Sequence, residues 1–187
     1  MPTRSRMRAR IALPDPARLS PQGRRIYESI LSTRGSLEGP FLAWLHAPQL
    51  ADPAEKLGAF CRYGTHLQPM ESEMLILLVA KAFRCDGEWQ IHAPIAARVG
   101  LDPAAIGAIG VGRRPILPTE RLATLHEFAS ELLGTHRVSA ERFERTMHML
   151  GTEGLVEVVG LVGYYTLVAM TLNAFEMTLE SDSPSTG

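Results

Sequence analysis

The sequence is short of cysteine and of net charge. It has only two cysteines, Cys61 and Cys85, in 187 residues, which is too few for the disulfide framework of a small secreted domain. Lysine and arginine together number 19 against 20 aspartates and glutamates, so the formal net charge is -1. A nearly neutral chain gives no indication of a nucleic-acid-binding or polybasic membrane-binding protein. These features favour a reducing, cytoplasmic setting.

The sequence also lacks an N-terminal apolar stretch of the signal-peptide kind. Its one long uncharged run, 158–175, has 18 residues, near the lower limit for crossing a bilayer. Glu157 and Glu176 flank this run, no Lys or Arg anchors either end, and Asn173 lies inside it. We therefore expect a helix buried in the core or in a subunit interface, and no membrane partner.

Alternating runs typical of strands are absent as well, and helix signals take their place. Ser20, Asp102 and Thr119 are capping residues placed before apolar-periodic segments. The segment 72–83 is apolar nearly all round, which predicts a central helix. The expected helices cover 20–32, 41–49, 53–67, 72–83, 84–100, a short segment after 102, 119–134, 139–151 and 152–177.

These segments predict an all-α fold, a helical bundle forming a single domain over 20–177. The arginine-rich N-terminal part, 1–19, is interpreted as a flexible basic tail rather than a targeting presequence. The polar C-terminal part, 178–187, is interpreted as a second flexible tail.

The segment 84–96, RCDGEWQIHAPIA, holds a cysteine, a glutamate and a histidine at spacings of three and four. On a helix, Cys85, Glu88 and His92 fall within about 60° of one another, with Trp89 on the same side. Burying titratable groups together is costly unless they pair or take part in chemistry. The shared face therefore indicates a pocket lined by these three side chains.

Electrostatics link this face to the preceding helix. A carboxylate four residues before His92 would hold one imidazole tautomer and raise the histidine pKa. Glu73 begins the apolar helix, and a helical hairpin could bring it against Glu88 and His92. Simpler interpretations stay open for each residue: Glu73 as a charge complementing a helix N-terminus, Cys85 as a small core residue, and Glu88 with His92 as a surface pair.

The segment 71–101 resembles the carboxymuconolactone decarboxylase and alkylhydroperoxidase D superfamily. The family pattern is a glutamate opening a helix, then a Cys-x-x-Cys or Glu-Trp type of motif, then a histidine and a glycine. The residues that fit this pattern are Glu73, Cys85, Glu88, Trp89, His92 and Gly100. The stretches 39–50 and 155–177 are also similar to the family, so the resemblance covers about 20–177.

The resemblance implies an all-helical bundle of the alkylhydroperoxidase D-like type that assembles into homotrimers or hexamers, with active sites near subunit boundaries. One departure concerns the peroxidase branch, whose redox pair is two cysteines three residues apart. Position 88 is a glutamate here, so a sulfenic acid on Cys85 would lack its resolving neighbour. Cys61 could serve only if the fold brings it close. The sequence GEWQIH is nearer the decarboxylase-like branch.

The first functional hypothesis is a carboxymuconolactone decarboxylase-like enzyme that works without a cofactor on a small organic acid or lactone. His92, oriented by Glu88, would act as general acid/base, and Glu73 would be a second acid/base with a raised pKa. The spacing of these groups matches no recognised metal pattern, so no metal is expected. The expected pocket residues are Phe41, Trp44 and Trp89 as apolar walls and His46 as a substrate-carboxylate contact or an ordinary surface group.

Two alternatives come from other classes. The first is an alkylhydroperoxidase-like thiol peroxidase, in which Cys85 attacks a hydroperoxide and an external thiol reduces the product. The second is a non-catalytic scaffold whose pocket binds a ligand or only supports an oligomer. A disulfide between Cys61 and Cys85, or peroxide consumption, would favour the peroxidase. Inertness in every assay after removal of Glu88 and His92, with unchanged ligand binding, would favour the scaffold.

Overall fold

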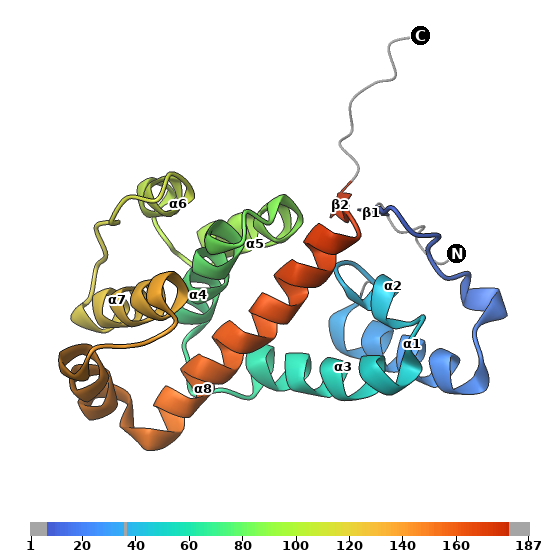
Figure 1. Cartoon of the computed structure of the whole chain (residues 1–187), viewed down its shortest axis with the longest axis horizontal. Helices are drawn as coiled ribbons and strands as arrows, with labels where there is room; N and C mark the ends of the chain where they lie inside the picture. Colours follow the sequence, from blue (N-terminus) through green and yellow to red (C-terminus); the bar gives the residue numbers. More distant parts are fainter. Residues whose placement is uncertain (1–6, 36, 180–187) are drawn as a thin grey trace, which may run out of the picture.

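A long helix, α8 (Ala140–Ala174), runs between two groups of helices (Figure 1). This computed structural model describes residues 7–35 and 37–179. The first group is α1 (Pro21–Arg34), α2 (Phe41–Trp44) and α3 (Pro48–Tyr63), and the second is α4 (Pro69–Ala82), α5 (Asp86–Arg98), α6 (Pro103–Gly110) and α7 (Glu120–Thr135). The predicted all-α fold is confirmed.

Helix α4 is the centre of the second group. All ten residues from Glu71 to Ala80 are buried, and α4 packs against α5, α6, α7 and α8. A helix that is apolar all round must be covered on every side, so the sequence predicted this position correctly. The two acidic exceptions, Glu71 and Glu73, have partners of their own.

The capping residues begin the helices that the sequence predicts. Ser20 Oγ accepts from the Gly23 N–H at 3.1 Å, and Asp102 Oδ1 accepts from the Ala104 N–H at 2.7 Å. Thr119 begins α7 in the same way. Each bond satisfies an N–H group that lacks a partner within its own helix.

The region of α2 and α3 differs from the prediction. Helix α2 ends at Trp44 rather than at 49, and α3 begins at Pro48 rather than at Pro53. Proline fits the first turn of a helix, and Pro48 takes that place. Pro53 lies inside α3 on its exposed side, where water can reach the carbonyl that proline leaves unpaired.

Helix α8 consists of two arms that meet at Gly151, as the separately predicted segments 139–151 and 152–177 imply. Gly151 has a φ of 69° and a ψ of 176°, a conformation that a residue with a side chain rarely adopts. The helix is long and apolar enough to cross a membrane by composition alone, but 61% of its most apolar window is buried inside the protein. Such burial is typical of the core helix of a soluble domain.

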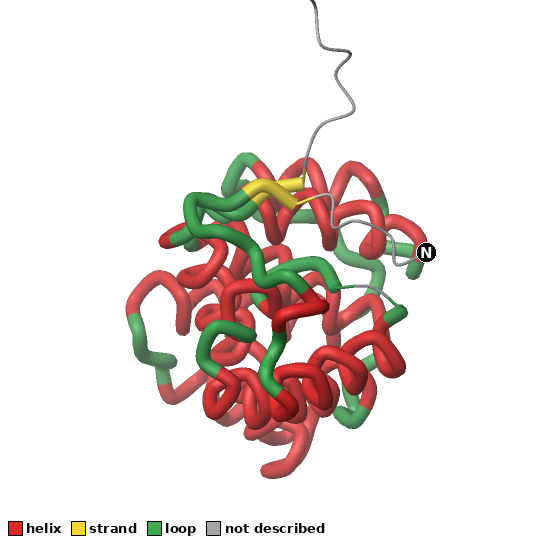
Figure 2. The backbone as a smooth tube through the Cα atoms, turned by 90° about the vertical axis from the view of Figure 1, so that its right-hand side faces the viewer, coloured by secondary structure: helices red, strands yellow, loops and turns green. Residues whose placement is uncertain are grey.

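The two ends of the described chain pair with each other. Strand β1 (Met7–Arg8) is antiparallel to β2 (Thr178–Leu179), and Figure 2 shows the pair at one end of the helices. Met7 is buried. Residues 7–19 and 178–179 therefore lie against the domain, so the flexible tails predicted over 1–19 and 178–187 are wrong for these residues, because apolar Met7 is buried in the core and β1 pairs with β2. Residues 1–6 and 180–187 lie outside the described residues.

Gly87 provides a test of the packing between α5 and Met177, the residue before β2. A Cβ at this position would lie 2.4 Å from the Met177 carbonyl oxygen. We expect Gly87→Ala to lower the free energy of unfolding by about 1–3 kcal/mol, since overpacking forces the backbone to shift. Gly107→Ala in α6 is the matched control, because nothing lies within 4 Å of its Cβ. Urea denaturation should show the control unchanged or slightly more stable, and equal effects of the two variants would contradict this packing.

Candidate active site

His92 is held between two buried carboxylates. Its Nδ1 lies 2.7 Å from Glu73 Oε2, and its Nε2 lies 3.2 Å from Glu88 Oε1. The three residues are 2–5% exposed. Both ring nitrogens therefore have an acceptor, which is the arrangement that an imidazolium requires. The pairing predicted from the sequence is present, and Glu73 has joined it.

A tight hairpin brings Glu73 to His92. Helix α4 ends at Ala82 and α5 begins at Asp86. In the turn between them, Arg84 adopts a φ of 51°, and the Cys85 N–H donates to the Ala80 carbonyl at 2.8 Å. The two helices run back antiparallel, so the first turns of α4 reach the middle of α5.

Glu73 does not act as a helix-capping charge. That role belongs to Glu71, whose Oε2 accepts from the Gln68 N–H at 2.9 Å in a capping box. Glu71 also accepts from Arg121 at 2.6 Å. With the N-terminus of α4 satisfied by Glu71, Glu73 is free to serve His92.

The two carboxylates determine the protonation of His92. Burial alone lowers the pKa of His92, but hydrogen bonds and negative charge from Glu73 and Glu88 outweigh it and raise the pKa from 6.5 to about 9. The imidazole is therefore protonated at neutral pH. Tyr165 stands edge-on to the ring, with centroids 5.4 Å apart, and fixes its orientation from the side of α8.

Cys85 lies outside this arrangement. It is the residue before α5 and has an extended backbone. Contrary to the prediction, Cys85 therefore does not lie on the helical face that carries Glu88 and His92. It is 1% exposed. Burial and the charges of Glu88 and Asp86 raise the pKa of its thiol to about 11, although backbone N–H groups of α5 lower it. A buried, protonated thiol is a poor nucleophile.

The other cysteine offers no alternative redox partner. Cys61 is a free, buried thiol on α3, and burial raises its pKa to about 11 as well. Neither cysteine lines the cavity described next.

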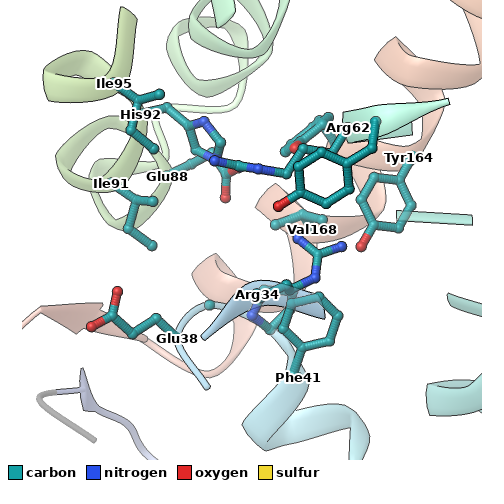
Figure 3. Close-up of a pocket in the computed structure, with 14 residues that line it drawn as sticks. Arg34, Glu38, Phe41, Arg62, Glu88, Ile91, His92, Ile95, Tyr164 and Val168 are labelled. Atoms are coloured by element: carbon teal, nitrogen blue, oxygen red, sulfur yellow. The ribbon is translucent and has the colours of Figure 1, made fainter. Parts of the chain in front are cut away.

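A cavity of about 160 Å³ opens beside His92 and Glu88, which is room for a small organic molecule of about the size of benzene. Figure 3 shows His92 and Glu88 on one side of it and Arg34 with Phe41 on the other. Its polar lining residues are Arg34, Glu38, Arg62, Tyr63, Glu88, His92, Tyr164 and Tyr165. Burial raises the pKa of both Tyr164 and Tyr165, so their hydroxyl groups stay protonated and can donate hydrogen bonds.

Of the residues predicted to shape the pocket, Phe41 alone lines this cavity. Trp44 is buried behind it, where its Nε1 donates to Thr171 Oγ1 at 3.0 Å. Trp89 lies on the outer side of α5 against Gly110. A Cβ on Gly110 would be 3.0 Å from the Trp89 ring. His46 is exposed and bonds the Ala12 carbonyl at 2.8 Å, so the surface interpretation of this residue is the right one.

Sequence reasoning missed the cationic and phenolic wall. Arg34 is the last residue of α1 and Arg62 the second-last of α3, positions where a basic residue commonly complements the helix dipole. Nothing in the sequence separates these arginines from ordinary ones. Tyr164 and Tyr165 lie in the most apolar run of the chain, and a buried tyrosine needs a polar partner for its hydroxyl. That need is the one signal that points to them.

One group of potential metal ligands lies apart from the cavity among the described residues. The side chains of His66, Glu153 and Glu157 approach within 4.8 Å of one another. Glu157 accepts from the His66 backbone N–H at 2.8 Å and lies 3.0 Å from its ring nitrogen. The carboxylate thereby anchors the loop before α4.

Comparison with solved structures identifies the fold. An uncharacterized peroxidase-related protein from Ralstonia eutropha JMP134, described as an alkylhydroperoxidase AhpD core, matches with a TM-score of 0.76 and 20% identity over 93% of each chain. An uncharacterized peroxidase-related protein from Silicibacter sp. TM1040 matches with a TM-score of 0.74 and 15% identity over 91% of each chain. No family model and no curated protein matches the sequence.

A third structural relative has a named activity. The debrominase Bmp8 matches with a TM-score of 0.70 and 15% identity over 86% of this chain and 87% of its own. A cysteine-to-alanine variant of Bmp8 has also been solved in complex with 2,3,4-tribromopyrrole. The chain therefore has the alkylhydroperoxidase D-like fold, as its motif predicts. At sequence identities this low, the structural match establishes the fold alone. The reaction must be argued from the residues of the site.

The protonation of His92 can be measured directly. We expect nitrogen NMR of the imidazole to show a titration near pH 9, with Glu73→Gln moving it down because one of the two acceptors loses its charge. Glu131→Gln is the control, because Glu131 belongs to α7 and pairs with Ser139 and Arg142 rather than with His92. By linkage, the His92 contribution to stability is fully present below pH 6.5 and is lost as the pH rises through 9. A His92 that is neutral at pH 7 would contradict this electrostatic account.

Proposed function

We propose that the protein is a cofactor-free acid/base enzyme, carboxymuconolactone decarboxylase-like, that acts on a small organic acid or lactone. The observation that carries the proposal is the buried Glu73–His92–Glu88 cluster, with His92 and Glu88 on the wall of a small cavity. Placing an imidazolium and a carboxylate at one concave surface provides an acid and a base for proton transfer.

The roles follow from the positions. Glu73 touches His92 from behind and lines no part of the cavity, so it is the positioning residue that fixes the ring through Nδ1. Glu88 and His92 face the substrate. From the sequence alone, Glu88 is expected to orient the His92 ring. The geometry favours Glu73 for this role instead.

Decarboxylation illustrates the chemistry that the cluster can support. The bond to the leaving carboxyl group breaks, its electron pair passes to a neighbouring carbonyl as an enolate, and carbon dioxide departs. The His92 imidazolium stabilises the negative charge that develops. The enolate carbon then takes a proton from the His92–Glu88 pair, and water restores it. A proton shift beside a carbonyl uses the same groups in the opposite order.

The thiol peroxidase alternative finds less support. It needs a reactive thiolate, and both cysteines are buried with raised pKa values. Position 88, which would hold the second cysteine of a redox pair, carries the glutamate bound to His92. Two structural relatives have peroxidase-related names. Those names describe the relatives and carry no evidence about the reaction of this chain.

Solvent-deuterium exchange tests the proposal on a panel of compounds rather than on one chosen substrate. We expect the protein in heavy water to catalyse exchange or carbon dioxide release for some member of a panel of small lactones and keto acids. Glu88→Gln should slow that reaction by about a hundredfold or more, because it removes the pocket-facing base. Cys85→Ala, the matched control, should stay within a few-fold of the original rate. Loss of activity in Cys85→Ala with retention in Glu88→Gln would favour the thiol mechanism instead.

We also propose that the partner of this chain is a second copy of itself, in a homotrimer or hexamer. One face of α8 supports this, because it is apolar or small and yet open to solvent at Val156, Val159, Gly160, Gly163, Leu167 and Met170. These positions fall within about 100° of one another on the helix. A continuous exposed apolar face of this kind is typical of an interface.

The size of the assembly tests this partner. We expect light scattering to give a multiple of the 20.5 kDa chain mass. Val156→Asp, at a residue that is 65% exposed, should shift the mass toward the monomer, because a charge would be buried between copies. Ile116→Asp is the control at an exposed apolar residue outside α8. A monomeric wild type, or equal effects of both variants, would overturn the assignment.

A further inference from the structure

We infer that Arg34 binds the substrate through a carboxylate and makes the cavity selective for small monoanions. This inference rests on the proposed function, because it assigns a substrate class to the same cavity. It concerns recognition rather than proton transfer, so the two can fail separately.

Arg34 is half-buried, and two nitrogens of its guanidinium lack a hydrogen-bond partner. Its Nε and Nη2 atoms are shielded from solvent and make no hydrogen bond. No ion pair links Arg34 to any carboxylate among the described residues, although Glu55 is buried on the adjoining helix α3. Buried N–H groups of a cation that lack an acceptor are costly to a folded protein. Such a cost is commonly tolerated where a ligand supplies the missing partner.

The surroundings hold Arg34 in place. Its Cζ stacks 4.5 Å from the centre of the Phe41 ring. Gly58 lets the backbone of α3 approach closely, since a Cβ there would lie 2.8 Å from Arg34 Nη2 and 2.1 Å from the Tyr164 hydroxyl. An aromatic face on one side and a glycine on another fit a planar guanidinium. The Arg34 side chain is therefore positioned by packing alone.

The cavity lining carries both signs of charge, with the carboxylates of Glu38 and Glu88 beside Arg34 and Arg62, and Arg34 is the arginine of the two that has buried nitrogens without an acceptor. The other arginine of the wall, Arg62, interacts electrostatically with Tyr165 and with the charge of Glu73. Arg62 is therefore already engaged with the His92 cluster. Arg34 lies across the cavity from that cluster (Figure 3), so a carboxylate held there would direct the rest of a small molecule toward His92 and Glu88. A cavity of about 160 Å³ leaves room for a few carbon atoms beyond the carboxylate.

The experiment compares butyrate with butyramide, which has the same shape and no charge. We expect calorimetry to show butyrate binding to the wild type and butyramide binding at least about tenfold more weakly, since a charge-assisted pair is lost. Arg34→Met keeps the apolar stem and removes the charge, and it should weaken butyrate binding at least about tenfold as well. Arg25→Met, at an exposed arginine of the same helix, is the matched control and should bind butyrate like the wild type.

A second readout separates recognition from a structural role. Ligand-free Arg34→Met should melt at the same temperature as the wild type or higher, because the unpaired charge is gone. A lower melting temperature, equal binding of butyrate and butyramide, or unchanged butyrate binding by Arg34→Met would each overturn the inference.

Glu88→Gln distinguishes this inference from the proposed function. If Glu88→Gln stops turnover while Arg34→Met still binds butyrate normally, the acid/base proposal stands and the anion site is wrong. If Arg34→Met loses butyrate while Glu88→Gln remains fully active, the anion site stands and the acid/base proposal is wrong.

Discussion

The structure of the site depends on one interaction, the pairing of His92 with Glu73 on one ring nitrogen and with Glu88 on the other. Two carboxylates buried side by side would repel each other, and a buried imidazole without acceptors would lose its proton. Together they satisfy one another, because the imidazolium offers one N–H to each carboxylate. The remaining features of the site serve to bring these three groups together or to place a substrate beside them.

The helical architecture provides the required geometry. The α4–α5 hairpin returns the chain so that Glu73 and His92 face each other, and α8 closes the cluster with Tyr165. Helix α4 is covered on all sides, which keeps Glu73 away from water and strengthens its interaction with the imidazolium. Helix α5 adds the Glu88 carboxylate from one turn before His92, on the side of the ring away from Glu73.

Local signals explain what the sequence could predict. Caps such as Ser20 and Thr119 determine helix starts through contacts three residues away, and the i,i+4 spacing of Glu88 and His92 fixes their proximity. The prediction for Cys85 was wrong because helical periodicity was extended through the residue before α5, where the backbone is extended. Trp89 lies about 100° round the helix from Glu88, enough to place it against α6 rather than in the cavity. Arg34 and Arg62 meet the site only through the packing of α1 and α3, which no local pattern encodes.

The central claim is that His92 is a doubly hydrogen-bonded imidazolium at the wall of the cavity. Neutron diffraction from crystals at pH 7 tests it most directly, because deuterium atoms on the ring become visible. The account predicts a deuteron on Nδ1 directed at Glu73 and a second on Nε2 directed at Glu88. A bare ring nitrogen, or a deuteron residing on either carboxylate, would contradict it.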